Sequence, residues 1–335
     1  MSSAQRAVVL GSGSWGTTFA KVLADAGHDV TIWARRPEVA NEINESHRNT
    51  GYLPGIDLPR NLHATPDLVA AVRGQQFVFG SVPAQTAREL SAQLAPLIEG
   101  DAVVVSLMKG VERASGLRMS EVLEGVLQLP AERVAVASGP NIALEIAKEQ
   151  PTAIVVASAS EATAVSVAKL ARNDYLRSFV NVDVIGTEFG GVLKNLIAIA
   201  VGIVDGVGYG ENTKASVMTR GLAEISDFAV AMGAQASTMI GLAGLGDLIA
   251  TCESPLSRNF TAGRLLGQGY VYDDVVAQMQ QTAEGLRSVG AILELAERHG
   301  VEMPIAKQID DVLHGRMSPA DLAPHLATDE GPSGE

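Results

Sequence analysis

The sequence is poor in cysteine and in basic side chains. Its one cysteine, Cys252, excludes a disulfide within the chain, which fits a reducing compartment. Lysine and arginine number 25 against 38 aspartates and glutamates, and the formal net charge is −13. Because a general binder of polyanions needs the opposite balance, nucleic acid is not an expected partner. A small phosphate compound can still bind where basic groups gather locally.

Long hydrophobic runs and metal-ligand patterns are also absent. The longest apolar stretch, residues 196–204, has nine residues, whereas a helix that crosses a bilayer needs about 20. Residues 7–10 are too short a run for the core of a signal peptide. The six histidines are scattered, without a His-Glu-x-x-His pattern. These absences predict a cytoplasmic protein with no membrane insertion and no metal site.

The composition and the first half of the chain indicate a globular α/β protein. Hydrophobic residues make up 47% and charged residues 19% of 335 residues, which favours about two domains of ~150 residues each. Short β-branched runs alternate with stretches of helical period, as in a parallel sheet covered on both faces. The expected strands are residues 7–10, 30–33, 77–79, 102–106, 134–137 and 153–157. We predict a Rossmann-type α/β domain with a mostly parallel sheet.

The pattern changes near Gly186, beyond which only helices are expected. The expected helices are residues 190–204, 214–232, 261–266, 272–279, 285–299 and 305–313, with loops at 206–210 and 253–257. We therefore predict a dinucleotide-binding domain over residues 1–187 and an all-α substrate domain over residues 188–328. The polar residues 329–335 are expected to be a disordered tail.

Residues 11–16 have the form G-x-G-x-x-G. They follow an expected strand and precede an expected helix over residues 17–26, which is the context that a dinucleotide-binding loop requires. Gly11 permits a tight turn, Gly13 lets the backbone approach a pyrophosphate, and Gly16 lets the helix pack close to the strand. The alternative is an ordinary glycine-rich turn between a strand and a helix.

Two arginines bear on the choice of nucleotide. Binders of NAD usually carry an acidic residue at the end of the second strand, where it bonds the ribose 2′-hydroxyl. Here Arg35 and Arg36 occupy that place. Because a guanidinium suits a 2′-phosphate, the pattern favours NADP(H). Glu38 can still accept from a ribose hydroxyl, so NAD(H) stays possible. The alternative for Arg35 and Arg36 is that they are solvated surface residues with no part in binding.

Two of the seven lysines stand in apolar surroundings. Lys109 follows an expected buried strand, at the sheet edge where open α/β folds bind ligands. Lys194 lies in an otherwise apolar helix. Desolvation, the positive N-terminal end of that helix and a second nearby cation would each lower the pKa of Lys194. Such a lysine can act as a general acid or base near neutral pH. The alternative is a lysine whose ammonium reaches solvent past a helix end.

Six further blocks occur in one order and resemble a known family. The blocks are residues 138–141, 190–195, 212–215, 219–221, 241–248 and 257–259. Together with the glycine loop they resemble bacterial NAD(P)-dependent glycerol-3-phosphate dehydrogenase, over about residues 7–315. The resemblance implies a Rossmann domain followed by a helical domain, and a homodimer. It also implies the reversible reduction of dihydroxyacetone phosphate to sn-glycerol 3-phosphate with NAD(P)H, for glycerophospholipid synthesis.

The resemblance implies three catalytic roles. Lys194 would donate a proton to the carbonyl oxygen as hydride arrives at carbon. Lys109 would hold substrate near the nicotinamide and influence the pKa of Lys194. Asp247, an acid among glycines in an apolar loop, would orient a lysine or a substrate hydroxyl. The structural alternative for Asp247 is an N-cap of the following residues, and the two roles are compatible.

The resemblance also implies substrate and cofactor contacts. Residues 257–259, Ser-Arg-Asn, are implied to form a phosphate clamp in a loop before a helix, since a guanidinium with neutral donors suits a phosphate. On its own, this tripeptide also fits an N-cap followed by a surface arginine. The implied substrate residues, besides Lys109, Lys194 and Asp247, are Gly139, Asn141, Asn195, Thr251, Ser257, Arg258 and Asn259. The implied cofactor residues, besides Gly11, Gly13, Gly16, Arg35 and Arg36, are Ser14, Trp15, Lys109, Ala143, Arg258 and Glu284.

This sequence departs from the family pattern at two places. Many relatives have serine or threonine where this chain has Asn141, and Thr282 and Ala283 before Glu284 are uncommon. Two other functions remain open. A β-hydroxyacid dehydrogenase would need a carboxylate site instead of a phosphate clamp. A dinucleotide sensor without turnover would explain the glycine loop but not Lys109, Lys194 and Asp247 together.

Overall fold

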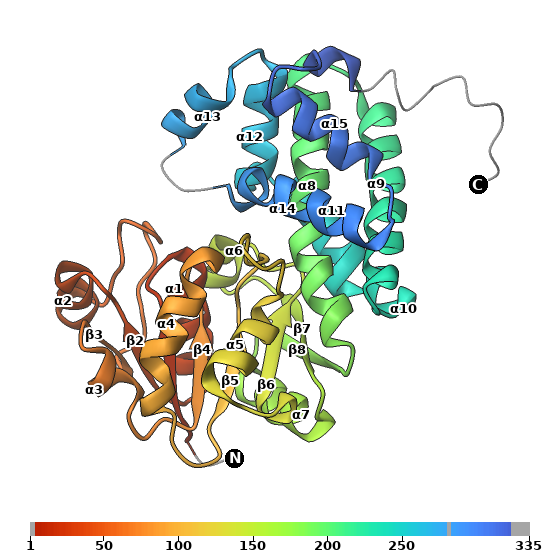
Figure 1. The fold of residues 1–335 in the computed structure, drawn as a ribbon. Coiled ribbons are helices and arrows are strands. Elements are labelled where there is room, and N and C mark those ends of the chain that lie inside the picture. Colours follow the sequence, from red (N-terminus) through yellow and green to blue (C-terminus); the bar gives the residue numbers. More distant parts are fainter. Residues whose placement is uncertain (1–3, 280–282, 323–335) are drawn as a thin grey trace.

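An eight-stranded sheet forms the N-terminal part of the protein (Figure 1). The computed structural model describes residues 4–279 and 283–322. The strand order is β3-β2-β1-β4-β5-β6-β7-β8, and all neighbouring strands are parallel except β6 and β7. The strands are β1 Arg6–Leu10, β2 Asp29–Trp33, β3 Leu62–Thr65, β4 Phe77–Gly80, β5 Val103–Ser106, β6 Val134–Ser138, β7 Thr152–Ser158 and β8 Leu176–Asn181. The predicted fold class, a mostly parallel Rossmann-type sheet, is confirmed.

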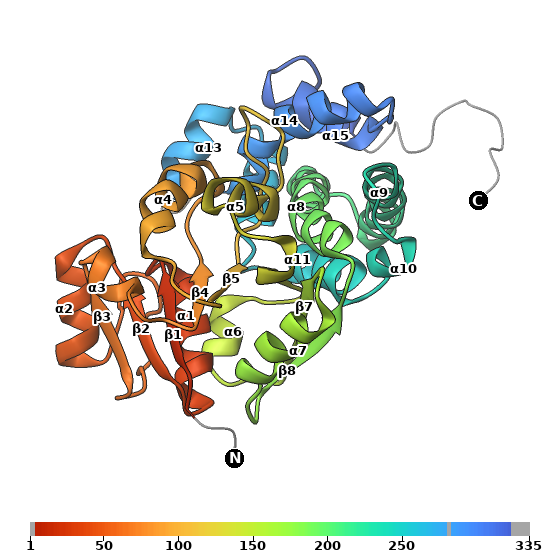
Figure 2. The same ribbon diagram turned by 60° about the horizontal axis from the view of Figure 1, so that its bottom comes forward.

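All six expected strands are present, but β3 and β8 were not predicted. Both lie at the ends of the sheet (Figure 2). β3 has only four residues, and β8 is half-exposed, with Phe179 and Val180 facing solvent. Edge strands need fewer buried side chains, so their hydrophobic pattern is weak. Their sequences therefore do not stand out.

Helices cover both faces of this sheet, and two hydrophobic clusters fill the space between the layers. The helices of this part are α1 Ser14–Asp25, α2 Pro37–Ser46, α3 Leu68–Val72, α4 Ala87–Leu94, α5 Met119–Leu127, α6 Ala143–Ala147 and α7 Glu161–Leu170. Short helical turns lie at Ala84–Thr86, Ala95–Leu97 and Ala131–Arg133. Helix α1 begins at Ser14, three residues earlier than predicted, so the glycine loop leads directly into its first turn.

The C-terminal part is helical over the residues that the structure describes, and it is built around α8 (Val184–Val207) (Figure 1). The other helical elements are α9 Glu211–Ala231, α10 Ala236–Met239, the π turn η4 Leu242–Gly246, α11 Asp247–Glu253, α12 Arg258–Gly267, α13 Tyr272–Gln278, α14 Glu284–His299, α15 Pro304–Leu313 and the turn η5 Pro319–Asp321. The six predicted helices are present, while α10, η4 and α11 were missed. The predicted loops at 206–210 and 253–257 are shorter, because α8 and α11 extend into them.

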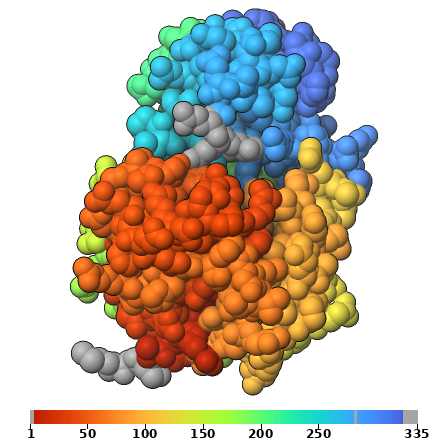
Figure 3. Space-filling view, turned by 90° about the vertical axis from the view of Figure 1, so that its left-hand side faces the viewer, coloured from red at the N-terminus to blue at the C-terminus, as the bar shows by residue number. Residues whose placement is uncertain are grey.

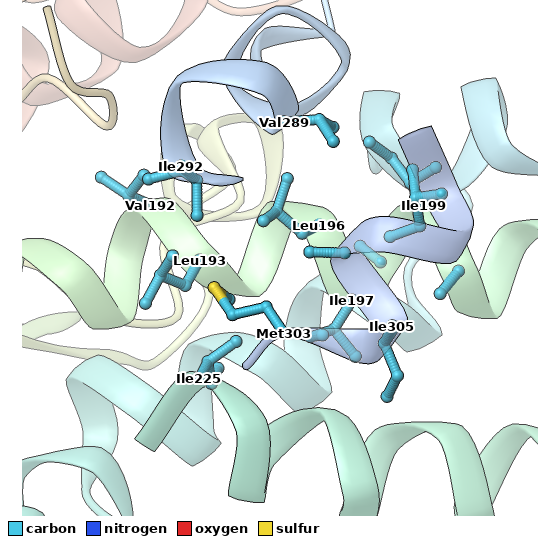
Figure 4. Packing of buried hydrophobic residues seen from close by; sticks show 14 of the residues in the cluster. Val192, Leu193, Leu196, Ile197, Ile199, Ile225, Val289, Ile292, Met303 and Ile305 are labelled. Carbon is cyan, nitrogen blue, oxygen red and sulfur yellow. The ribbon is translucent and has the colours of Figure 1, made fainter. Parts of the chain in front are cut away.

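Helix α8 is long and apolar enough to cross a membrane, but 83% of its most apolar window is buried inside the protein. Figure 4 shows Leu193, Leu196 and Ile197 of this helix among side chains from neighbouring helices. Helix α8 is therefore the core helix of the second domain. The predicted boundary after residue 187 falls within its first turn. The predicted tail, residues 329–335, lies outside the described residues.

Glycines bring α12 close to α8. A Cβ atom at Gly202 would lie 2.2 Å from the carbonyl oxygen of Phe260, and one at Gly263 would lie 2.1 Å from that of Ile199. Gly206 and Gly267 repeat this arrangement one turn further along. Because larger residues would force the helices apart, this spacing fixes where the N-terminus of α12 sits relative to α8.

Candidate active site

The glycine loop has the geometry predicted for a dinucleotide-binding turn. Gly11 has a φ of +118°, and a Cβ there would lie 2.3 Å from the carbonyl oxygen of Ser81. A Cβ at Gly16 would lie 2.1 Å from the carbonyl oxygen of Gly11. At Gly13 a Cβ would meet nothing within 4 Å of the described chain, and no described side chain caps the helix there. The N-terminus of α1 is thus open to an anion.

One side chain and one backbone carbonyl from the loop after α2 hold the glycine loop in place, and the sequence did not reveal them. Asn49 Nδ2 donates to the carbonyl oxygen of Ser12 at 2.9 Å and to Thr17 Oγ1 at 2.8 Å. The Ser14 hydroxyl donates to the carbonyl oxygen of Tyr52 at 2.9 Å. The Trp15 indole packs edge-on against Phe19, and its buried N–H has no partner among the described atoms.

The two arginines lie beside this loop. Strand β2 ends at Trp33, whose carbonyl oxygen accepts from the N–H of Gly11 at 3.1 Å, so Arg35 and Arg36 come just beyond that contact. Both arginines are exposed. The Arg36 guanidinium lies 5.6 Å from the centre of the Tyr52 ring and 3.8 Å from Glu38. Tyr52 therefore lies beside the predicted cofactor residues Arg36 and Ser14, although no sequence pattern marks it.

Lys109 and Lys194 meet on one carboxylate. Lys109 Nζ donates to Asp247 Oδ2 at 2.7 Å, to Asn141 Oδ1 at 2.6 Å and to the carbonyl oxygen of Gly139 at 3.3 Å. Lys194 Nζ donates to the other Asp247 oxygen, Oδ1, and to Thr251 Oγ1 at 2.6 Å. Residues from four separated segments thus form one hydrogen-bonded centre, which we call the lysine centre.

Asp247 is not in a loop, as the sequence suggested. It is the first residue of α11, directly after the π turn η4, and its side chain makes no cap. It is 1% exposed, and both carboxylate oxygens accept from lysine. The π turn is possible because a Cβ at Gly244 would lie only 2.0 Å from the carbonyl oxygen of Met239. Local glycine therefore aims the Asp247 carboxylate at the lysines.

Lys194 does not lie near the N-terminus of its helix, as the sequence suggested, so the predicted effect of the helix dipole on this residue is wrong. Helix α8 begins at Val184, ten residues before Lys194, and the field of a helix end falls off within about one turn. Desolvation by burial lowers the pKa of Lys109 to about 7; the neighbouring Lys194 adds to this effect and Asp247 opposes it.

Two glycines let the chain pass close to the lysine centre. Gly139 follows β6 with a φ of +120°, which any larger residue would adopt only under strain. A Cβ at Gly191 of α8 would lie 2.5 Å from Ser138 Oγ and 3.6 Å from Lys109 Cδ. The methylenes of Lys109 therefore lie against α8. Ser138 Oγ and Asn141 Nδ2 are buried there without a partner among the described atoms.

The predicted phosphate clamp is not in a loop before the helix. Arg258 and Asn259 form the first turn of α12, and Ser257 Oγ caps it by accepting from the N–H of Phe260 at 3.2 Å. Asn259 Nδ2 donates to Asn195 Oδ1 at 2.8 Å, and Asn259 Oδ1 accepts from the N–H of Gly285 at 3.0 Å. The capping alternative thus holds for Ser257, and Asn259 ties α12 to α8 and α14.

The remaining predicted residues lie around these groups. Glu284 begins α14, and burial raises the pKa of its carboxyl while Arg258 and Lys109 oppose that rise. Ala143 begins α6, and its carbonyl oxygen accepts from Thr18 Oγ1 of α1 at 3.2 Å. Thr282 lies outside the described residues. Within the described residues, no group of three or more histidine, cysteine or acidic side chains could hold a metal.

A dinucleotide fits this arrangement. The space above Gly13, the unpartnered N–H of Trp15 and the unpartnered amide of Asn141 lie in segments that the resemblance assigns to the cofactor and substrate. Figure 3 shows a recess where the helical domain meets the sheet domain. The lysine centre is built from both sides of this junction.

Comparison with known proteins decides the family. Models of the N-terminal and C-terminal parts of NAD-dependent glycerol-3-phosphate dehydrogenase match residues 6–164 and 183–324. This chain belongs to that family. It is 65% identical over 327 residues to the glycerol-3-phosphate dehydrogenase [NAD(P)+] of Leifsonia xyli, covering 98% of this chain and 89% of that protein. To the enzyme of that name from Streptomyces griseus it is 52% identical over 314 residues, with 94% of each chain covered.

Solved structures of the family agree. The crystal structure of glycerol-3-phosphate dehydrogenase from Coxiella burnetii superimposes with a TM-score of 0.91 at 33% identity, covering 97% of this chain and 99% of that one. The predicted resemblance is therefore confirmed, and both alternative functions, the β-hydroxyacid dehydrogenase and the sensor without turnover, lose their basis.

Proposed function

We propose that this protein reduces dihydroxyacetone phosphate to sn-glycerol 3-phosphate with NAD(P)H, reversibly, and thereby supplies glycerophospholipid synthesis in the cytoplasm. The lysine centre is the observation that carries this proposal. Two ammonium groups share the Asp247 carboxylate, and Lys109 and the glycine loop follow the carboxyl ends of two strands, β5 and β1, of one sheet. A carbonyl oxygen that gains negative charge needs such groups. The family membership supports the same activity.

The lysine centre divides the chemistry between its members. The bound nicotinamide supplies the hydride. As negative charge develops on the carbonyl oxygen, the Lys194 ammonium stabilises it and donates a proton from Nζ. Asp247 and Thr251 hold that ammonium by accepting two of its hydrogen bonds. Lys109, anchored on Asn141 and Gly139, holds the substrate.

Lys109 is a second candidate for the proton donor. Burial brings its pKa to about 7, so a proton can leave it near neutral pH. Substitution of each lysine in turn separates the two roles, because only loss of the donor removes the pH dependence of turnover.

The start of α12 is proposed to bind the substrate phosphate. Arg258 supplies a guanidinium, and Ser257 and Asn259 supply neutral polar atoms on the first turn of a ten-residue helix. Asn195 reaches the same place through its hydrogen bond with Asn259. The substrate is proposed to lie between this turn and the lysine centre, in contact with Gly139, Asn141 and Thr251.

The cofactor is proposed to lie along the carboxyl ends of β1 and β2. Its pyrophosphate would sit over the glycine loop, at the open N-terminus of α1. Arg35 and Arg36 would contact a 2′-phosphate, which makes NADP(H) the preferred cofactor, with NAD(H) also used. Other proposed cofactor contacts are Ser14, Trp15, Lys109, Ala143, Arg258 and Glu284.

We further propose that the protein is a homodimer and that residues 1–187 and 188–328 form its two domains.

A spectrophotometric assay of NADPH oxidation tests this function. The wild-type protein should reduce dihydroxyacetone phosphate. Arg258→Ala should raise the KM for this substrate and lower kcat/KM by roughly ten-fold or more, since a charge-assisted hydrogen bond contributes about 1.5–3 kcal/mol. For unphosphorylated dihydroxyacetone, a poorer substrate, the same substitution should lower kcat/KM much less. Absence of turnover with dihydroxyacetone phosphate contradicts the proposal, and equal losses on both substrates would show that Arg258 acts elsewhere.

A further inference from the structure

A second buried ion pair joins the two domains outside the lysine centre. Arg118 Nη1 donates to Glu188 Oε2 at 2.7 Å, with the two side chains 14% and 5% exposed. The N–H of Ser120 donates to the other carboxylate oxygen at 2.9 Å, and the Ser120 hydroxyl also donates to this carboxylate. Neither the proton transfer nor the phosphate clamp described above uses these groups.

The pair connects the two segments that carry the lysines. Glu188 lies on α8, six residues before Lys194. Arg118 immediately precedes α5 and pairs with Val111 in an isolated antiparallel bridge, which closes the hairpin formed by residues 111–118. Lys109 lies two residues before Val111, the first residue of this hairpin. The ion pair therefore links the base of the Lys109 segment directly to the Lys194 helix.

Glu188 lies on the face of α8 that meets the sheet domain. Residues 188, 191 and 195 follow the i, i+3, i+7 spacing of one helix face. On this face Glu188 binds the start of α5, Gly191 lies against the Lys109 methylenes, and Asn195 binds Asn259. The first two contacts are with the sheet domain, whereas Asn259 belongs to α12 of the helical domain. A slide or rotation of α8 against the sheet domain would change the Glu188 and Gly191 contacts together, so the Glu188 contact fixes the alignment of Gly191 with Lys109.

A buried ion pair of this kind is poor support for stability, because desolvation offsets much of the attraction, but it can specify one arrangement. We propose that Arg118 and Glu188 are positioning residues that hold α8 against the Lys109 hairpin, so that both lysines reach Asp247 at once. This inference rests on the roles proposed above for Lys109 and Lys194.

The test replaces the pair with an apolar one. Arg118→Met/Glu188→Met removes both charges at similar side-chain length, so the variant should fold. The buried N–H and hydroxyl of Ser120 lose their acceptor, which should lower the melting temperature by a few degrees. If the pair positions the lysines, kcat should fall about ten-fold or more, since a displacement of about 1 Å can cost up to ~10²-fold. The KM for NADPH should change much less than kcat, because the described hydrogen bonds of Arg118 and Glu188 are with each other, Ser120 and Glu121, and none of them is with the glycine loop.

A matched pair on the same hairpin provides the control. Arg88 Nε and Nη2 donate to the two Glu112 oxygens at 2.8 Å each, but this pair joins the hairpin to α4 within the sheet domain. Arg88→Met/Glu112→Met should keep the wild-type kcat. A comparable loss in this control would show a general effect of the hairpin and overturn the inference.

The single variants and Lys194→Met separate the remaining outcomes. Glu188→Gln should also lower kcat, because the amide nitrogen that replaces one carboxylate oxygen cannot accept from Arg118 or from the N–H of Ser120. If the double variant does not fold, the near-isosteric Glu188→Gln carries the test alone. A folded double variant, or Glu188→Gln, with wild-type kcat overturns the positioning role of the pair. If Lys194→Met is inactive in the same experiment, the proposed function still stands. If Lys194→Met is active, the proposed proton donor is wrong instead.

Discussion

Single side chains of the lysine centre have more than one partner, and this determines what each substitution reveals. Asp247 accepts from both lysines, so removal of one lysine leaves the buried carboxylate paired with the other. A buried carboxylate without a partner would be strongly destabilising. Substitution of Lys194 therefore tests chemistry with little interference from folding, whereas substitution of Asp247 does not.

Lys194→Met should fold, bind NADPH and turn over at least about 10²-fold more slowly, which is the lower range of general acid catalysis. Methionine has a similar length and suits the apolar surroundings of α8. The melting temperature, NADPH affinity and kcat should be measured on one preparation. Lys214→Met, at a partly buried lysine of α9 paired with Asp205 and Glu211, is the matched control and should keep kcat. A folded Lys194→Met protein with near-normal kcat would exclude Lys194 as the acid.

Arg35→Ala/Arg36→Ala should raise the KM for NADPH much more than that for NADH. Loss of a charge-assisted contact to a 2′-phosphate costs about 1.5–3 kcal/mol, which is at least a ten-fold change in affinity. Both side chains are exposed, so stability should hardly change. Initial rates with the two cofactors give the comparison. An equal loss for both would mean that the arginines do not read the 2′-phosphate.

Sequence patterns identified the residues of the lysine centre but missed the side chains that support them. Asn49 holds the glycine loop from 37 residues away, and Glu188 binds Ser120 from 68 residues away. Neither residue belongs to a local motif, and their types alone suggest ordinary surface polarity. Such partners become visible only when the fold brings distant segments together.

Secondary-structure elements followed the sequence wherever their hydrophobic pattern was strong. Buried strands and amphipathic helices were predicted, while the edge strands β3 and β8 were not. The segment from α10 to α11 was also missed, because four glycines between residues 233 and 246 hide any helical period. Those glycines serve close packing: Gly244 lies against Met239, and the turn that they form aims Asp247.

Helix α15 illustrates how one element depends on another's side chain. Glu224 of α9 is 7% exposed, and its two oxygens accept from the N–H groups of Ile305 and Ala306, at the N-terminus of α15, at 2.8 and 3.0 Å. Desolvation raises the pKa of Glu224 to about 7, and these two hydrogen bonds oppose the rise. Between its ordinary pKa and about 7, the folded protein holds a proton that the unfolded chain has released.

The free energy of unfolding should therefore fall as pH rises through this window, by up to roughly 3 kcal/mol from this group at about 1.36 kcal/mol per pH unit. Glu224→Gln should remove that part of the slope. Urea unfolding at several pH values from about 5 to 8 measures it. Glu302→Gln, an exposed carboxylate just before α15, is the control and should keep the wild-type slope. An unchanged slope in Glu224→Gln would show that this carboxyl does not titrate in the folded protein.

At the scale of the whole molecule, the two domains share groups that neither can satisfy alone. Val111 of the sheet domain is fully buried in the core of the helical domain, and α8 packs against β6 and β7. Two buried ion pairs, Lys109 with Asp247 and Arg118 with Glu188, cross the same junction. Opening this junction would leave buried charges and apolar surface exposed at once, so we expect the domains to unfold together.

Calorimetry should therefore show one cooperative transition, and NADPH should shift all of it. Ligand at about 100 times its Kd adds about 2.7 kcal/mol to the folded state, enough to raise the melting temperature by a few degrees. The Arg35→Ala/Arg36→Ala protein should show a smaller shift at the same NADPH concentration, because its affinity is lower. Two separate transitions, of which NADPH moves only the first, would mean that the glycine loop and the lysine centre belong to independently folding units. In that case the junction would contribute to catalytic geometry but not to the stability of the fold.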